Sequence, residues 1–120
     1  MSICMPSCLF FHRKHFDKFL DAIIENGHND LHYVAMGVYS NLNKEVLEKM
    51  KKAGYYQMRV GIETGSKKIA DSIGLSRKFN LERLKEVLAV ARDVGIEMYG
   101  TFIFGARGSS YEEDLKTIEL

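Results

Sequence analysis

The chain has almost no net charge, and it lacks any long apolar segment. Its 17 Lys and Arg residues nearly cancel its 16 Asp and Glu residues, which leaves a formal charge of +1. This balance offers no electrostatic basis for binding nucleic acid or an anionic membrane surface. No apolar run reaches the roughly 18 residues that a bilayer-spanning helix needs. We therefore expect neither a nucleic acid nor a membrane as a partner.

Cysteine and proline are scarce, and both occur only near the N-terminus. Cys4, Cys8 and the single proline, Pro6, lie in the stretch MSICMPSCLFF. This stretch is apolar, but it lacks the basic start and the small-residue cleavage site of a signal peptide. We therefore predict reduced cysteines and a cytoplasmic location. Residues 1–14 form an N-terminal segment that the sequence pattern does not place.

The remaining pattern alternates between helices and strands, in a composition typical of a globular domain. Apolar residues at helical spacing predict helices over His15–Glu25, Lys44–Ala53, Lys67–Ile73, from Asn80 to Gly95, and after Ser110. Apolar runs of strand length predict strands at Leu31–Tyr39, Gln57–Glu63 and Ile96–Phe104. Side chains suited to N-caps occur at Asn41 or Asn43, at Asn80, and in the capping-box-like Ser110-x-x-Glu113.

The order of these elements predicts an α/β fold with a parallel sheet and right-handed crossovers. Three strands cannot close a barrel, so we expect part of a larger (βα) barrel. The strand Leu31–Tyr39 is long, apolar and free of proline. Without a preceding neighbour it would expose unpaired backbone groups, which predicts self-association through that edge.

The stretch from Gln57 to Ser66 is the centre of this arrangement. Side-chain alternation puts Arg59, Gly61 and Glu63 on one face of the strand. A carboxylate at the end of such a strand lies where α/β sheets and barrels place ligands. Gly65 suits a tight turn, and Ser66 can cap the following helix. The alternative is an ordinary turn between strand and helix, in which Glu63 faces water.

Two linked stretches, LEKMKKAGYYQMRVGIETGS and ARDVGIEMYGTFIFGARGSSYEEDLKTIEL, resemble a known family. They are similar to the second half of the radical S-adenosylmethionine (SAM) core, above all in cobalamin-associated enzymes and the tRNA methylthiotransferase-like branch. The resemblance runs from about Phe16 to Leu120 and is strongest in Ala53–Ser66 and Val94–Leu120. It implies about three βα units of a partial, TIM-barrel-like (βα)6 barrel.

The resemblance also implies cofactors and site residues. Members of the family hold a 4Fe-4S cluster through three cysteines in C-x3-C-x2-C and cleave SAM to a 5′-deoxyadenosyl radical, with cobalamin as a candidate further cofactor. Carried over to this sequence, Glu63 and Ser66, beside Gly61, would contact the ribose and methionine part of SAM. Ile103 and the Gly105 backbone would flank its adenine.

The sequence departs from the family in two places. Gly105-Ala106-Arg107-Gly108-Ser109-Ser110 stands for the family's G-x-P-G-E-T, which predicts a less rigid loop with one carboxylate fewer. Cys4 and Cys8 have the C-x3-C spacing, but Phe11 stands where a third cysteine belongs. Two thiolates cannot replace three in holding such a cluster. We expect Cys4 and Cys8 to lie at the end of the second βα unit, with the cluster loop absent; a degenerate cluster motif is the alternative.

The first functional hypothesis is therefore a fragment of a radical SAM enzyme that supplies SAM-contacting strands, lacks the cluster loop and is inactive alone. A second hypothesis is a non-catalytic half-barrel or interaction module. A third is a different (βα) barrel whose Gly105–Ser110 loop binds a phosphate-type ligand, with Arg107 as the clamp. The substrate is not readable, because substrate contacts in such barrels come from loops and added domains.

Overall fold

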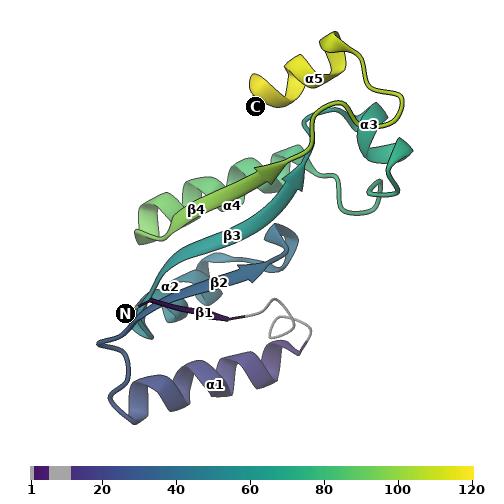
Figure 1. The fold of residues 1–120 in the computed structure, drawn as a ribbon. Helices are drawn as coiled ribbons and strands as arrows, with labels where there is room; N and C mark the ends of the chain where they lie inside the picture. Colours follow the sequence, from purple (N-terminus) through teal and green to yellow (C-terminus); the bar gives the residue numbers. More distant parts are fainter. Residues whose placement is uncertain (1, 6–11) are drawn as a thin grey trace.

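The structure is a computed structural model that describes residues 2–5 and 12–120. Its framework is a parallel sheet in the order β1-β2-β3-β4. These strands are β1 (Ser2–Met5), β2 (His32–Gly37), β3 (Tyr55–Glu63) and β4 (Glu97–Phe102). Each strand neighbours the next one in sequence, as in a stretch of (βα) barrel (Figure 1). The predicted α/β fold with parallel strands is confirmed.

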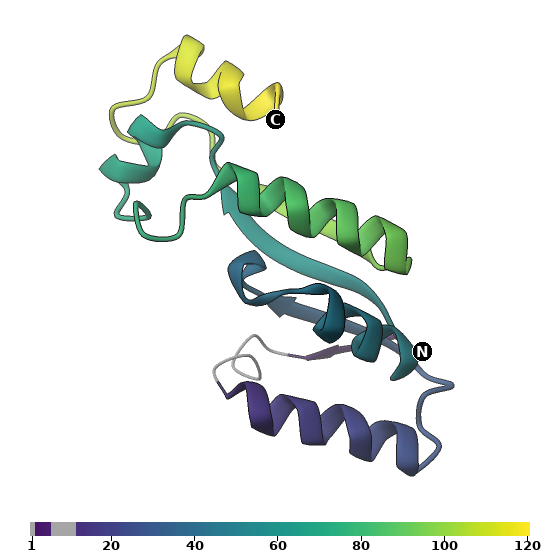
Figure 2. The same cartoon turned by 180° about the vertical axis from the view of Figure 1, so that it is seen from behind.

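The helices α1 (Arg13–Glu25), α2 (Lys44–Lys52) and α4 (Leu81–Val94) cover one face of this sheet (Figure 2). The short helices η2 (Tyr39–Asn41), α3 (Lys67–Ser72) and α5 (Tyr111–Ile118) lie toward the carboxyl ends of the strands. One hydrophobic core fills the space between the covered face and its helices. Its largest fully buried members include Tyr55, Leu20, Leu47, Met58 and Leu84.

The helix starts follow from local hydrogen bonding, because a side chain satisfies a backbone N–H that has no partner inside the helix. Asn43, rather than Asn41, caps α2 by accepting from the Val46 N–H. Asn80 caps α4 through the Arg83 N–H, and this helix ends at Gly95, where φ is +84°. The predicted caps at Asn80 and Gly95 are confirmed.

The second predicted strand is shorter than expected. It ends at Gly37, and Tyr39 instead begins a turn of 3-10 helix. The Tyr39 side chain is buried, and its hydroxyl donates to the Lys78 carbonyl and accepts from the Asn80 N–H at 3.1 Å. These hydrogen bonds of Tyr39 hold the chain outside the sheet, whereas the apolar run in the sequence predicts that the strand continues to Tyr39.

The strand β1 was not predicted, and it changes the expected edge of the sheet. Ser2–Met5 pairs with β2 from His32 to Ala35. The prediction that Leu31–Tyr39 is an unpaired edge is therefore wrong over this stretch. Cys4 lies in β1, whereas Cys8 lies outside the described residues. Self-association stays a prediction; among the described strands, the edges of the sheet are β1 and β4.

Candidate functional site

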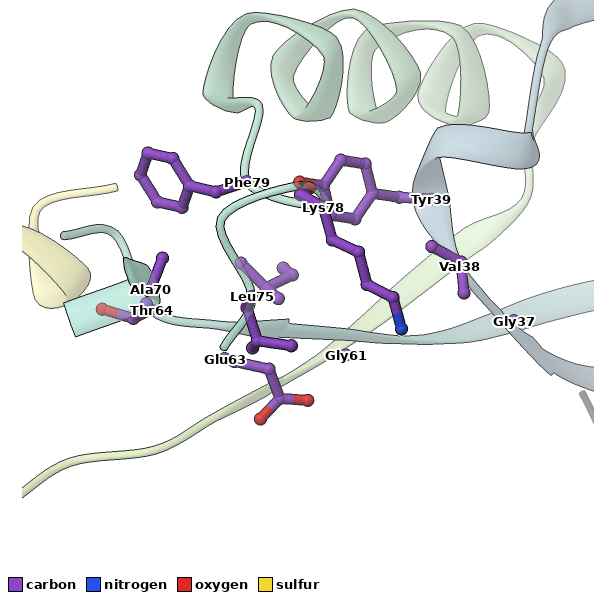
Figure 3. A pocket seen from close by; sticks show the side chains of 11 residues that line it. Gly37, Val38, Tyr39, Gly61, Glu63, Thr64, Ala70, Leu75, Lys78 and Phe79 are labelled. Atoms are coloured by element: carbon purple, nitrogen blue, oxygen red, sulfur yellow. Dashed lines mark hydrogen bonds between the residues drawn. The ribbon is translucent and has the colours of Figure 1, made fainter. Parts of the chain in front are cut away.

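A pocket of about 210 Å³ opens at the carboxyl ends of β2 and β3. Its walls come from the end of β2 with η2, from the end of β3, and from α3 with the loop that follows it. The lining residues are Gly37, Val38, Tyr39, Gly61, Ile62, Glu63, Thr64, Ala70, Leu75, Lys78 and Phe79. Figure 3 shows Lys78 extending from its loop toward β3, whereas the Glu63 carboxylate points away from it. The end of the central strand thus carries a carboxylate within a concave surface.

The backbone at Glu63 has an uncommon conformation. Its φ is +69°, the single positive value among the described non-glycine residues. The Thr64 N–H donates back to the Ile62 carbonyl at 2.9 Å, which closes a three-residue γ-turn around Glu63. The positive-φ form of this turn is rare and strained. The turn also shifts the register between β3 and β4, and the Ile103 N–H donates to the Glu63 carbonyl at 2.8 Å.

The turn folds the Glu63 carboxylate back over Gly61. A Cβ atom placed on Gly61 would lie 2.4 Å from Glu63 Oε1. Gly61 therefore provides the space that the carboxylate occupies. Strict alternation predicted that the two residues share a face; the turn breaks that alternation, yet the carboxylate remains on the Gly61 side.

Ser66 is engaged by the protein itself. It is 1% exposed, and its hydroxyl accepts from the Ile69 N–H at 3.2 Å as the cap of α3. The same hydroxyl donates to Glu113 Oε2 on α5. The hydrogen bond donated by Ser66, followed by the one from Lys116, holds the pKa of Glu113 below its ordinary value. Glu113 therefore does not complete the expected capping box, although Ser110 does cap α5.

Hydrogen bonds of Thr64 and Gly65 to Thr117 also link the end of β3 to α5. Thr117 Oγ1 accepts from the Gly65 N–H at 2.9 Å and lies 3.3 Å from the Thr64 hydroxyl. A Cβ on Gly65 would meet the Lys116 carbonyl at 2.5 Å, so only glycine permits this approach of α5. Ser66, Glu113, Thr64, Gly65 and Thr117 are called the α5 latch below.

The loop after β4 is closed by a carboxylate from α5. Asp114 accepts from the Gly105 N–H at 3.0 Å and from the Ser109 hydroxyl. The Arg107 carbonyl accepts from the Ser72 hydroxyl at 3.1 Å, which ties the loop to α3. A loop that the sequence predicts to be one carboxylate poorer thus receives a carboxylate from the following helix. A carboxylate on the Gly105 amide also argues against the phosphate site proposed for this loop, because it would repel an anion.

The predicted site residues are only partly brought together. Gly61 and Glu63 share the pocket, and Ile103 joins Glu63 through its backbone. Gly105 does not line this pocket. Tyr39, Lys78 and Phe79 were missed, because they lie in segments that look like connections, and only the folded chain brings them to β3. Thr117 was missed for the same reason.

The described residues contain no cluster of three or more His, Cys, Asp or Glu side chains that could hold a metal ion. The whole sequence has 2 cysteines, so it cannot supply the three thiolates of a radical SAM cluster. The residues of this chain therefore do not fit the cluster. Across residues 2–5 and 12–120, every helix is too short or too polar to cross a membrane.

Comparison with known proteins identifies the class to which this fold and strand-end site belong. The model of the radical SAM superfamily matches residues 8–120, so the chain belongs to that superfamily. A stretch of 64 residues is 31% identical to cytidylyl-2-hydroxyethylphosphonate methyltransferase from Streptomyces wedmorensis. This stretch is 53% of the chain and 12% of that methyltransferase, so the chain spans a small part of this relative.

Proposed function

We propose that this chain forms part of the SAM-binding wall of a radical SAM enzyme. The complete enzyme would hold SAM and a 4Fe-4S cluster, and it would cleave SAM reductively to a 5′-deoxyadenosyl radical. Membership of the superfamily supports this proposal. The similarity to a methyltransferase favours group transfer as the reaction class, with cobalamin as a candidate further cofactor.

The observation that carries the proposal is the strained turn at Glu63. Backbone strain of this kind costs about 1–3 kcal/mol and clusters at functional sites. Here the strain places a half-buried carboxylate over Gly61, where none of the described residues forms a hydrogen bond or ion pair with it. A carboxylate in this position can accept hydrogen bonds from ribose hydroxyls or from the ammonium group of SAM.

The other predicted site residues would have different roles around SAM. Ile103 and Gly105 follow β4 and would flank the adenine, and Gly61 would leave room for the Glu63 carboxylate that contacts the ligand. Ser66 is buried and bonded to Glu113, so we assign it to the support of the turn. The cluster would have to be held with thiolates other than this chain's two cysteines.

The test uses the 15N-labelled chain titrated with SAM and followed by NMR. We expect saturable shifts at the amides of Gly61, Glu63 and Ile103. Glu63→Gln should weaken binding by roughly tenfold to a hundredfold, because a charge-assisted hydrogen bond contributes about 1.5–3 kcal/mol. Glu97→Gln is the matched control, since Glu97 is exposed at the opposite end of β4.

A second variant separates the carboxylate's position from its presence. Gly61→Ala puts a methyl group where Glu63 Oε1 lies, 2.4 Å from its expected Cβ. The flexible carboxylate can move aside, so the fold should survive while SAM binding falls. Equal SAM affinity of wild type, Glu63→Gln and Gly61→Ala would show that Glu63 does not contact SAM. A large fall in melting temperature for Glu63→Gln would assign it to the fold.

A further inference from the structure

The face of the sheet away from α1, α2 and α4 carries a row of exposed side chains. Strand register places Met36, Arg59 and Tyr99 side by side on β2, β3 and β4. Met36 is 44% exposed and Tyr99 is 52% exposed. Arg59 is exposed as well, although it lies in the central strand of the three. A barrel interior or a ligand surface is the usual place for such a row in a parallel sheet.

The guanidinium of Arg59 is oriented by two neighbouring side chains, and part of its N–H donors have no partner among the described residues. Its central carbon lies 5.5 Å from the centroid of the Tyr99 ring. Its Nε donates to Gln57 Oε1 at 3.4 Å, and no carboxylate among the described residues forms an ion pair with it. The two terminal nitrogens therefore have no partner in that part of the chain. Two parallel N–H donors of this kind match the two oxygens of an oxyanion.

Toward the strand ends, the neighbours of Arg59 on this face are small and exposed. Gly61 and Thr101 form the next pair on the same face toward the strand ends, and Gly61 has no side chain. The Glu63 carboxylate lies over Gly61. Gly61 lies two residues, roughly 6.6 Å, from Arg59 along β3. The face thus offers separate contacts for a cationic or hydroxyl group and for an anionic group.

We infer that Arg59, stacked on Tyr99, binds an oxyanion of the substrate, either a carboxylate or a phosphoryl group. The description of this ligand as the substrate rests on the proposed function, in which SAM occupies the strand ends beside Glu63. Tyr99 orients the guanidinium through its ring, and Gln57 holds Nε, so the terminal nitrogens meet the anion together. Arg59 is then a specificity-determining residue for an anionic substrate.

The experiment titrates the 15N-labelled chain with inorganic phosphate, and separately with acetate, at constant ionic strength set by sodium chloride. Saturable shifts are expected at the Arg59 Nε–H and at the amides of Arg59 and Tyr99. The stronger of the two probes identifies the phosphoryl or the carboxylate source. Arg59→Gln should weaken this binding at least tenfold, and Tyr99→Ala should weaken it several-fold. Arg92→Gln, an exposed arginine on α4, is the control and should leave it unchanged.

Non-saturable shifts, or equal shifts at Arg92 and Arg59, would overturn the inference. Unaltered anion binding by a folded Arg59→Gln variant would overturn it too. Glu63→Gln distinguishes the two proposals, because it should weaken SAM binding roughly tenfold to a hundredfold and leave the response to the anion unchanged. Anion binding at Arg59 without any SAM response would support the site while contradicting the proposed function. SAM binding without an anion response would support the proposed function and contradict the anion site at Arg59.

Discussion

At Glu63 the chain holds an L-residue in a backbone region that favours glycine. Its φ is +69° and the turn is closed by the Thr64 N–H. The left-handed region costs an ordinary residue about 1–2 kcal/mol, so glycine would be the expected residue if only the turn mattered. We therefore propose that the Glu63 carboxylate serves ligand binding rather than the turn.

Glu63→Gly should therefore separate stability from ligand binding. Removing the left-handed strain gains about 1–2 kcal/mol, and the greater freedom of glycine in the unfolded chain costs about 0.5–1 kcal/mol. Urea unfolding should show a free energy of unfolding that is unchanged or raised by up to about 1.5 kcal/mol. SAM binding should be lost. A clear loss of stability would mean that the carboxylate supports the fold.

The strand-end position of Glu63 and its proximity to Gly61 could be predicted from side-chain alternation. The positive φ could not, because it accompanies a register shift between β3 and β4 that appears only when the two strands pair. The role of Ser66 as a helix cap was likewise predictable from its neighbours. Its bond to Glu113 was not, since the two residues lie 47 positions apart.

At the scale of elements, α5 is attached in an unusual way. Thr117 is its single buried residue among those described, whereas Tyr111 is 75% exposed and Ile118 is 69% exposed. The α5 latch and the Asp114 contacts therefore hold the helix mainly by hydrogen bonds. Directional bonds of this kind fix its position without a large apolar interface.

Thr117→Val should release α5 from β3. The substitution keeps the shape of the side chain but removes the acceptor for the buried Gly65 N–H. An unsatisfied buried donor costs about 1–3 kcal/mol. Amide exchange in α5 should speed up accordingly, while exchange in β3 changes little. Thr101→Val, at an exposed position of β4, is the matched control; equal effects of both variants would rule out this role for Thr117.

Acid should loosen the same helix. The pKa of Glu113 is lowered, first by the Ser66 hydroxyl and then by Lys116. A carboxyl with a lowered pKa in the folded state stabilises that state above its unfolded pKa, and this contribution is lost as the pH falls through the folded pKa. Protection of α5 amides should therefore decline below about pH 4.5. Ser66→Ala should raise the pKa of Glu113, as read from its carboxyl carbon by NMR. An unchanged titration would contradict the assignment.

Helices and their caps were the most predictable elements, because their signals are local. Asn80 and Gly95 bound α4 as the sequence indicates. The strand β1 was not predictable, because four residues before a proline carry no usable periodicity. Its identity as a strand depends on pairing with β2.

At the scale of the whole molecule, the chain belongs to the radical SAM superfamily but lacks the three cysteines that hold a radical SAM cluster. The superfamily match covers residues 8–120, yet the sequence holds 2 cysteines. Anaerobic reconstitution of this chain with iron and sulfide should give no stoichiometric cubane cluster, because the third thiolate is missing. Analysis that finds about four irons and four sulfides per chain, with the matching optical absorption, would contradict this expectation.

The polar attachment of α5 has a thermodynamic consequence. Release of a helix that buries little apolar surface exposes little, so both its heat-capacity change and its urea dependence should be small. Opening of the core beneath α2 and α4 should show large values of both. Native-state hydrogen exchange at rising urea would then give α5 amides a nearly flat free energy of opening, and β2 and β3 amides a steep one. Rising urea would thus favour opening of the core at β2 and β3 while leaving the local opening of α5 nearly unchanged. A fall in pH would instead favour the opening of α5.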